Sequence, residues 1–375
     1  RNQGSPHSQS AAPPAHRTEM KILIPFLIFA TLQAAPRNLS KPIPLGNMPT
    51  RVHVFEDYET EIEKRWWLRG EPVKANLPQS LSASRPNTRA SRATITKDFD
   101  RKMGDQTKMY KAVIFNPVPG PPMGPNTHLS FRYHLKGTDT LRVQIYSLSK
   151  NYHRHLVLTD LTQGKWQTAA VDMTKARRPD GTGGPLAKDE RIDDIQFYIP
   201  PTADLRIDDI VLYETAAKEE KRPFPRRIIF TGWFDTGKQG NEWPGDFKIV
   251  LHKKPRTWDA AQSVPHPKSK LPWLRIHLRG IHSLSKENEL FFKYRAITDG
   301  KATMIVKLMN SQTSDEYAVR LRNLNGKDWD AVTIPFTLKK RLPGNRIPEV
   351  DEIQILLEQP GELLIDDLLL YERGE

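Results

Sequence analysis

The sequence has 375 residues and a formal net charge of +13, with 37% hydrophobic and 9% aromatic residues. It contains no cysteine, which excludes disulfides, cysteine-ligated zinc and cysteine nucleophiles. The aromatic content argues against wholesale disorder. The positive charge favours anionic partners without identifying them, and the alternative is that it serves solubility only.

The N-terminal region has the pattern of an export signal. Met20-Lys21 precedes the apolar run Ile22 to Leu32, and small residues follow at Ala34-Ala35. A charged start, a short apolar run and a small-residue end are typical of a signal peptide, and the run is too short to span a bilayer. We interpret residues 1–35 as a leader and signal peptide, with residues 1–19 as unrelated sequence. The alternative is a buried strand or helix at 22–32. We therefore expect a secreted, periplasmic or cell-surface protein with no transmembrane span after signal removal.

A proline-rich polar segment at 36–50 is interpreted as a linker, and domain one is predicted at 51–215. Its strands are indicated by period-two alternation of apolar and polar residues, which gives each strand one buried face and one exposed face. The predicted strands, in chain order, are Val52 to Glu59, one near Ala93 to Ile95, Met109 to Phe115, Leu129 to Leu135, Leu141 to Ile145, one through Leu156 and Leu158, one from Trp166 onward, one through Ile195 and Ile199, and Leu205 to Glu214.

A second linker is predicted at 216–226, and domain two at 227–375 repeats the pattern. Leu205 to Glu214 reads LRIDDIVLYE, and Leu363 to Glu372, 158 residues later, reads LLIDDLLLYE. Phe131-Arg132-Tyr133 matches Phe292-Lys293-Tyr294 at an interval of 161. A repeat of this length indicates a tandem duplication.

Short alternating strands, frequent turns and no sustained helical period predict an all-β protein. We expect two tandem antiparallel β-sandwich domains. In each, the closing strand (205–213 or 363–371) should lie beside the opening strand (52–58 or 228–234).

Each copy resembles the galactose-binding-domain-like jelly rolls of the carbohydrate-binding-module type. The resemblance rests on the opening strand with its acid and on the closing Ile207-Asp208-Asp209 and Ile365-Asp366-Asp367 strands. It covers nearly the whole chain after the signal segment. It implies a jelly-roll fold and weakly indicates a carbohydrate ligand.

The resemblance also implies a structural Ca²⁺ ion in each domain, held by acids of the first and last strands. The carboxylates concerned are Glu59, Asp208 and Asp209 in domain one and Asp235, Asp366 and Asp367 in domain two. Calcium takes six to eight oxygen ligands, and backbone carbonyls can complete such a shell. Adjacent residues on a strand point to opposite faces, so the two aspartates of a pair share a role only at a bulge. The alternative is that they are solvated or cap backbone groups there.

The polar faces of the strands supply the candidate ligand-binding residues. Sugars are held by aromatic rings stacked on their apolar faces and by polar groups bonded to hydroxyls. The candidates are Tyr146, Gln144, Tyr198, Gln196, Arg132 and His155 in domain one and Lys307 and Arg320 in domain two, where the more basic face favours an anionic chain. The alternatives are plain solvent exposure, or cover by the neighbouring domain. Trp66, Trp67, Trp243, Trp258 and Trp273 are alternative stacking residues, or core residues.

We interpret the protein as a secreted, non-catalytic binding protein that recognises a polysaccharide or glycan. Glycosidases need two carboxyls facing each other about 5–10 Å apart, and neighbours on one closing strand do not offer this. No nucleic-acid-binding motif is present. Two alternatives stay open: a structural or adhesive cell-surface protein that binds other proteins, and a polysaccharide-active hydrolase.

Overall fold

The structure is a computed structural model that describes residues 38–59, 67–75, 89–117, 121–215, 220–235, 243–251, 259–338, 342–343 and 346–374. The expected signal segment, Trp66 and Trp258 lie outside these residues. Among the described residues, no helix has the length and apolar character needed to cross a membrane.

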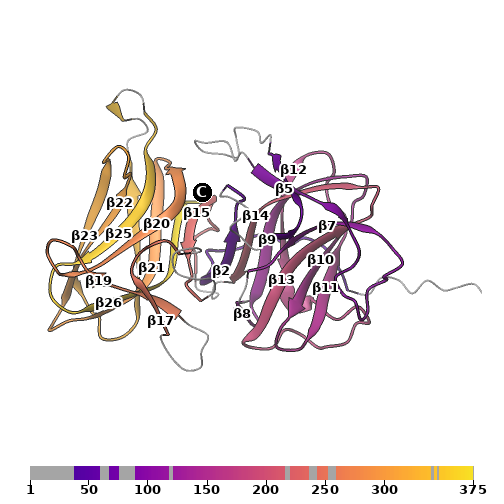
Figure 1. Cartoon of the computed structure of the whole chain (residues 1–375), viewed down its shortest axis with the longest axis horizontal. Helices are drawn as coiled ribbons and strands as arrows, with labels where there is room; N and C mark the ends of the chain where they lie inside the picture. Colours follow the sequence, from indigo (N-terminus) through magenta and orange to yellow (C-terminus); the bar gives the residue numbers. More distant parts are fainter. Residues whose placement is uncertain are drawn as a thin grey trace, which may run out of the picture. The chain divides into compact units, whose positions relative to one another are not determined.

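Domain one is built almost entirely from strands (Figure 1). They are β1 (Leu39–Ser40), β2 (Arg51–Glu56), β3 (Trp67–Arg69), β4 (Glu71–Lys74), β5 (Arg89–Arg92), β6 (Thr94–Thr96), β7 (Tyr110–Phe115), β8 (Pro122–Met123), β9 (Thr127–Lys136), β10 (Leu141–Ser147), β11 (Tyr152–Leu158), β12 (Trp166–Asp172), the 3-10 helix η3 (Met173–Lys175), β13 (Glu190–Ile199) and β14 (Asp204–Glu214). Sheet I has the order β1-β11-β10-β13-β7-β3, and sheet II has the order β12-β9-β14-β5-β4 with β2 on β14.

Domain two repeats this arrangement. Its strands are β15 (Arg227–Gly232), β16 (Gly245–Asp246), β17 (Lys248–Leu251), β18 (Asp259–Gln262), β19 (Val264–Pro265), β20 (Pro272–Ser283), β21 (Glu287–Ile297), β22 (Ala302–Met309), β23 (Glu316–Leu324), β24 (Asp330–Thr337), β25 (Glu349–Leu357) and β26 (Glu362–Glu372). Sheet III has the order β17-β18-β26-β21-β24 with β15 on β26, and sheet IV has the order β16-β20-β25-β22-β23.

The order in which the chain visits the two sheets is the same in both domains. In domain one, β5, β9, β12 and β14 lie in sheet II, and β7, β10, β11 and β13 lie in sheet I. In domain two, β18, β21, β24 and β26 lie in sheet III, and β20, β22, β23 and β25 lie in sheet IV. Eight strands shared in this way between two antiparallel sheets form a jelly roll. The predicted all-β sandwich fold is therefore confirmed for both copies.

The closing strands occupy the predicted position. β14 pairs antiparallel with β2, and β26 pairs antiparallel with β15. Each closing strand also pairs along most of its length with a central strand. The partner is β9 in domain one and β21 in domain two. The near-identical sequences of β14 and β26 thus form the centre of equivalent sheets.

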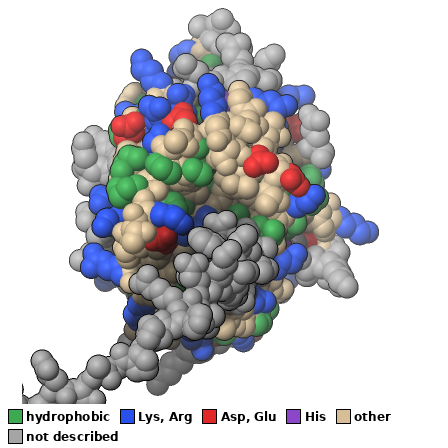
Figure 2. Space-filling model, turned by 90° about the vertical axis from the view of Figure 1, so that its right-hand side faces the viewer, with side chains coloured by type: hydrophobic (Ala, Val, Ile, Leu, Met, Phe, Trp, Pro, Cys, Tyr) green, Lys and Arg blue, Asp and Glu red, His purple; other side chains and the backbone are tan. Residues whose placement is uncertain are grey.

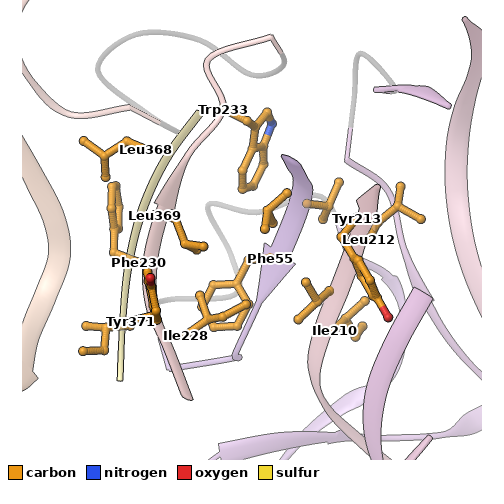
Figure 3. Packing of buried hydrophobic residues seen from close by; sticks show 14 of the residues in the cluster. Phe55, Ile210, Leu212, Tyr213, Ile228, Phe230, Trp233, Leu368, Leu369 and Tyr371 are labelled. Atoms are coloured by element: carbon orange, nitrogen blue, oxygen red, sulfur yellow. The ribbon is translucent and has the colours of Figure 1, made fainter. Parts of the chain in front are cut away.

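A continuous hydrophobic cluster joins the two domains, although no strand pair among the described residues joins a sheet of one to a sheet of the other. All six residues of β2 are buried. Figure 3 shows Phe55 of β2 among side chains of both domains, with Ile228 and Phe230 of β15 on one side and Ile210 of β14 on the other. Apolar burial therefore stabilises the contact between the domains as well as each sandwich.

The segment expected to be a linker at 36–50 packs on domain one over its described part. Leu39 and Ser40 form β1, which pairs in parallel with β11. Ile43 bridges Ala170, and the side chain of Met48 is 1% exposed. The proline-rich composition identified an irregular segment, but an irregular segment can still bury apolar side chains against a neighbouring sheet.

Candidate functional site

The outward face of sheet I carries most of the ligand-binding residues predicted for domain one. Gln144 of β10 donates from Nε2 to Oε1 of Gln196 of β13 at 3.1 Å. Tyr198, two residues along β13, donates its hydroxyl to the same Oε1 at 2.9 Å. These three side chains therefore lie on one face and contact each other through Gln196.

These side chains are not exposed, contrary to the expectation from strand alternation. Gln144 and Gln196 are 0% exposed, and Tyr198 is 2% exposed. His155 of β11 is also buried, at 8%. These side chains are covered by residues of domain one itself. Cover by the neighbouring domain was the expected alternative to solvent exposure.

The cover is the loop of residues 97–109, which joins β6 to β7. The backbone N–H of Phe99 donates to the hydroxyl of Tyr198 at 3.1 Å, and Asp98 Oδ2 lies 2.7 Å from Arg142 Nη1. Further along, Asp100 Oδ1 lies 3.6 Å from Nδ1 of His153 on β11. We call this segment the covering loop, because its contacts extend across β10, β11 and β13.

The covering loop is held in a compact conformation by its own polar groups. Gln106 donates from Nε2 to the backbone carbonyls of Asp98 and Asp100, both at 3.1 Å. A Cβ at Gly104 would lie only 2.5 Å from Cγ of Asp98, so the close approach requires glycine. Burial alone would raise the pKa of Asp100, but hydrogen bonds from His153 and from the N–H of Met103 outweigh it and hold the pKa below its usual value.

A pocket of about 560 Å³ lies beside the covering loop, at the ends of β7, β10, β11 and β13 of sheet I. We call it the Tyr110 pocket. Its lining is mainly apolar, with a few polar and charged side chains, and consists of Lys108, Met109, Tyr110, Thr140, Arg142, Val157, Tyr198, Ile199, Pro200 and Pro201. Of the residues predicted to bind a ligand, Tyr198 is the one that lines this pocket.

Arg142 connects the pocket to the covering loop. Its guanidinium lies 4.9 Å from the ring centroid of Tyr110 and 4.3 Å from that of Tyr198, within the range of cation–π attraction. Its Nη1 also forms the ion pair with Asp98, whose side chain is fully buried. Burial raises the pKa of Tyr198, so this hydroxyl stays protonated at neutral pH. Arg142 is thus fixed in place, with part of its side chain reaching the pocket.

The other predicted residues of domain one lie elsewhere. Tyr146 is half-buried at the far end of β10, where its hydroxyl donates to Oδ1 of Asn151 and its ring centroid lies 4.9 Å from that of His153. Arg132 belongs to β9 of sheet II, so it cannot share a face with Tyr146 and Gln144. It lies 5.8 Å from the ring of Trp166 and pairs with Asp209 at 3.1 Å.

The equivalent face of domain two, on sheet IV, carries Lys307 and Arg320. Lys307 of β22 pairs with Glu316 at 3.0 Å, and Arg320 of β23 pairs with Glu358 at 2.5 Å. The Arg320 side chain is 52% exposed. Trp273 of β20 lies next to this face but is 7% exposed, and Trp243 is fully buried. Of the candidate stacking residues, Trp243 and Trp273 are therefore buried, and Lys307 and Arg320 are surface cations.

The two aspartates of each closing strand form a β-bulge. Asp209 and Asp367 have φ values of 45° and 49°, and the strand register shifts at both places. The first aspartate of each pair accepts a hydrogen bond from the backbone N–H of the second, at 2.8 Å in domain one and 2.7 Å in domain two. Burial, together with the adjacent carboxylate, raises the pKa of Asp208 and of Asp366 well above the usual value.

The second aspartate of each pair binds a cation from the neighbouring central strand. Asp209 pairs with Arg132, and Asp367 pairs with Lys293 at 2.6 Å. Arg132 and Lys293 are equivalent positions of the duplication. The repeated Ile-Asp-Asp motif thus builds the same bulge and ion pair in both copies.

The acids predicted to hold calcium have other partners in domain two. Arg51 of β2, in domain one, forms ion pairs with both Asp235 and Asp367, and its side chain is 4% exposed. Burial raises the pKa of Asp235 to about 7 although Arg51 opposes the shift. For Asp367, Arg51 and Lys293 outweigh burial, so its pKa lies below the usual value. This cluster already contains two cationic side chains.

In domain one, Glu59 accepts a hydrogen bond from the backbone N–H of Arg89 at 2.9 Å. Across the described part of the chain, no three His, Cys, Asp or Glu side chains are grouped so that they could hold a metal ion. Calcium requires six to eight oxygen ligands, and these acids are largely committed to guanidinium, ammonium and backbone donors. The described residues therefore do not fit the calcium sites that the resemblance implied.

Neither the role of Tyr110 nor the covering loop was predicted from the sequence. A change in the interval between the copies could have indicated the loop. The interval is 176 residues between Trp67 and Trp243 but 161 residues between Phe131 and Phe292. Copy one therefore has extra residues between these positions. The covering loop, at 97–109, is longer than its counterpart at 266–271 in domain two.

Comparison with solved structures finds carbohydrate-binding modules of jelly-roll fold. The tandem CBM22-1–CBM22-2 domain of Paenibacillus barcinonensis Xyn10C matches 89% of this chain and 100% of its own, with 11% identity and a TM-score of 0.30. TmCBM61 in complex with β-1,4-galactotriose matches 36% of this chain and 91% of its own, with 13% identity and a TM-score of 0.25. No protein-family model and no curated protein matches the sequence. The fold assignment rests on the strand order described above.

Proposed function

We propose that this protein binds a polysaccharide in the Tyr110 pocket of domain one without cleaving it. The observation that carries the proposal is the composition of the pocket. Tyr110, Met109, Pro200 and Pro201 offer an aromatic and apolar surface, and Arg142 adds polar donors. Ligand pockets of several hundred Å³ with mostly apolar walls and a few fixed polar groups suit a sugar ring, which has both apolar C–H faces and hydroxyls.

The positions of the carboxylates support a non-catalytic role. Hydrolysis of a glycosidic bond requires two carboxyl groups that face each other across the sugar. No Asp or Glu is among the described residues that line the Tyr110 pocket. Asp98, which contacts the pocket residue Arg142, is buried and paired with it. We therefore propose binding as the function of this pocket.

Replacing Tyr110 tests the proposal. We expect Tyr110→Ala in the full chain to reduce affinity for a bound polysaccharide about tenfold, because a stacking contact is worth roughly 1 kcal/mol or more. Affinity is measured by calorimetric titration after a screen of neutral and acidic polysaccharides, and a thermal melt checks that the variant is folded. Tyr146→Ala is the matched control, since Tyr146 lies on the same sheet outside the pocket and should bind normally.

Two results would contradict the proposal. One is a loss of affinity for Tyr146→Ala with none for Tyr110→Ala, which would return the site to the covered face. The other is the absence of binding to every polysaccharide in the screen, which would favour the structural or adhesive alternative.

We also propose that the protein is exported. The support is the charged start, apolar run and small residues of 20–35. Expression of the chain with a C-terminal tag, followed by N-terminal sequencing of the protein recovered outside the cytoplasm, tests this. Cleavage close to residue 35 is expected, and retention of the uncleaved chain in the cytoplasm would refute it.

A further inference from the structure

A second pocket, of about 480 Å³, lies on the other side of Asp98 and Phe99. We call it the Arg101 pocket. It is lined by Arg69, Thr96, Lys97, Asp98, Phe99, Arg101 and Gln106. Three of the seven lining residues are cations and one is an acid, whereas the Tyr110 pocket is mainly apolar.

The cations of the Arg101 pocket have no carboxylate partner among the residues that the structure describes. Within the part of the chain that the structure describes, no carboxylate forms an ion pair with Arg69, Lys97 or Arg101, whereas other surface cations such as Arg92 and Arg346 have one. The acid of the pocket, Asp98, is already paired with Arg142. An anionic group entering this pocket would therefore meet uncompensated cations.

One of these cations is held in a defined position. Arg69 donates from Nε to Oγ1 of Thr96 at 3.4 Å and from Nη1 to the carbonyl of Leu68 at 3.2 Å. Its guanidinium lies 5.8 Å from the ring centroid of Phe99. A side chain that is already held in place loses less conformational entropy on binding a ligand than a freely rotating one. The N–H donors of a guanidinium also match the geometry of carboxylate and sulfate oxygens.

The two pockets adjoin through direct contacts. Asp98, which lines the Arg101 pocket, pairs with Arg142, which lines the Tyr110 pocket. Phe99 lines the first and donates from its N–H to the hydroxyl of Tyr198, which lines the second. One extended ligand can therefore contact both pockets across this shared wall. The face of the molecule drawn in Figure 2 carries Lys and Arg side chains beside a group of hydrophobic ones.

We propose that the Arg101 pocket binds the acidic group of an anionic polysaccharide whose neighbouring sugar ring lies in the Tyr110 pocket. The ligand class is a polysaccharide that carries carboxylate or sulfate groups. This inference rests on the function proposed for the Tyr110 pocket and adds the charge of its ligand.

Matched pairs of polymers test the inference with the full chain. Polygalacturonic acid is compared with its fully methyl-esterified form, and chondroitin sulfate with desulfated chondroitin. For at least one pair we expect the more acidic member to bind about tenfold more tightly at low salt, with the ratio falling as salt rises, because exposed charges are screened. The pair that shows the difference identifies the group as carboxylate or sulfate.

Variants locate the effect. The double variant Lys97→Gln with Arg101→Gln should bind the acidic polymer no better than its less charged counterpart. Lys286→Gln with Lys301→Gln is the charge-matched control, because both lysines are exposed in domain two and the net charge changes equally. The control should keep the preference. An equal loss in the control would overturn the inference, since the preference would then arise from total charge.

The failures of the two proposals are distinguishable. If the less charged polymers bind and lose affinity in Tyr110→Ala, but the acidic ones bind no better, only the acidic-group inference fails. If no polymer of either pair binds, the acidic-group inference fails, and the proposed function fails with it only when no polysaccharide of the wider screen binds.

Discussion

The equivalent faces of the two domains, on sheets I and IV, have different burial although the strands beneath them are copies. In domain two, β22 alternates strictly between buried and half-buried residues, and β23 alternates between half-buried and exposed ones. In domain one, five of the seven residues of both β10 and β11 are buried, and so are the last six of β13. The difference comes from the covering loop, since its counterpart at 266–271 is short. A duplicated sheet can therefore present a covered face in one copy and an open face in the other.

The largest effect should come from removing the ion pair under the covering loop. Asp98→Ala leaves the guanidinium of Arg142 without its carboxylate, and breaking a buried pair typically costs about 3–5 kcal/mol. We expect a loss of this order in the free energy of unfolding, measured by urea denaturation. Glu358→Ala is the matched variant in domain two, because its pair with Arg320 is exposed and should contribute less than about 1 kcal/mol. Equal losses would show that the two faces do not differ in this way.

The second effect is a dependence of the free energy of unfolding on pH. We expect it to arise from Asp194 of β13, on the covered face of domain one. Burial, with help from Asp193, raises the pKa of Asp194 from 3.8 to about 6. The folded state then holds this proton more tightly than the unfolded state, so the stabilisation is complete below about pH 4 and is lost as pH rises through about 6. The amplitude is about 3 kcal/mol at most, from about two pKa units.

Asp194→Asn should remove this component, since an amide does not titrate. The measurement is the difference in unfolding free energy between wild type and variant at pH 4 and pH 7. The variant should gain relative stability at pH 7. A difference that is the same at both pH values would contradict a raised pKa of the buried Asp194.

A smaller effect is expected on the open face. Lys307 and Arg320 were predicted to bind an acidic chain, and that prediction stays to be tested. Each is already paired with a glutamate, so Lys307→Ala and Arg320→Ala should each weaken binding of an acidic polymer by no more than about threefold, a cost typical of exposed charges. Loss of binding in these variants, with normal binding by Tyr110→Ala, would move the ligand site to domain two.

The smallest expected effect is that of chelation. A calcium ion bound only by the folded state would raise the melting temperature in proportion to RT ln(1 + [L]/Kd). The acids of the closing strands have guanidinium and ammonium partners, so we expect excess EDTA to leave the melting curve unchanged. A fall of several degrees, with calcium found by elemental analysis, would restore the calcium prediction.

The fold was predictable because its signals are local and occur twice. Alternation in Leu129 to Leu135 and in Leu141 to Ile145 indicates strands directly, and the repeat of the closing strand identifies the copies. The sequence also indicated that the two aspartates of each pair could share a role only at a bulge. The structure has such a bulge at Asp209 and at Asp367. These inferences need only neighbouring residues and one comparison along the chain.

The candidate site was less predictable because it depends on contacts between distant segments. Alternation shows that Gln144 points away from the core, but not that Asp98, forty-six residues earlier, lies over it. It also does not show to which sheet a strand belongs, so Arg132 was grouped with the wrong face. Tyr110 was treated only as part of a strand, since nothing nearby marks the pocket beside it.

Arg51 shows how a duplicated residue can acquire a separate use in each copy. Its counterpart 176 residues later, Arg227, lies 3.0 Å from Glu372 of its own domain. Arg51 instead reaches Asp235 and Asp367 of the other domain, and the equivalent glutamate, Glu214, contacts His53 at 2.9 Å. The second half of the chain therefore lacks one of the cations that balance its own acids. Dividing the gene between the two copies would separate Arg51 from both anions, so domain two expressed alone would contain two buried aspartates without this cation.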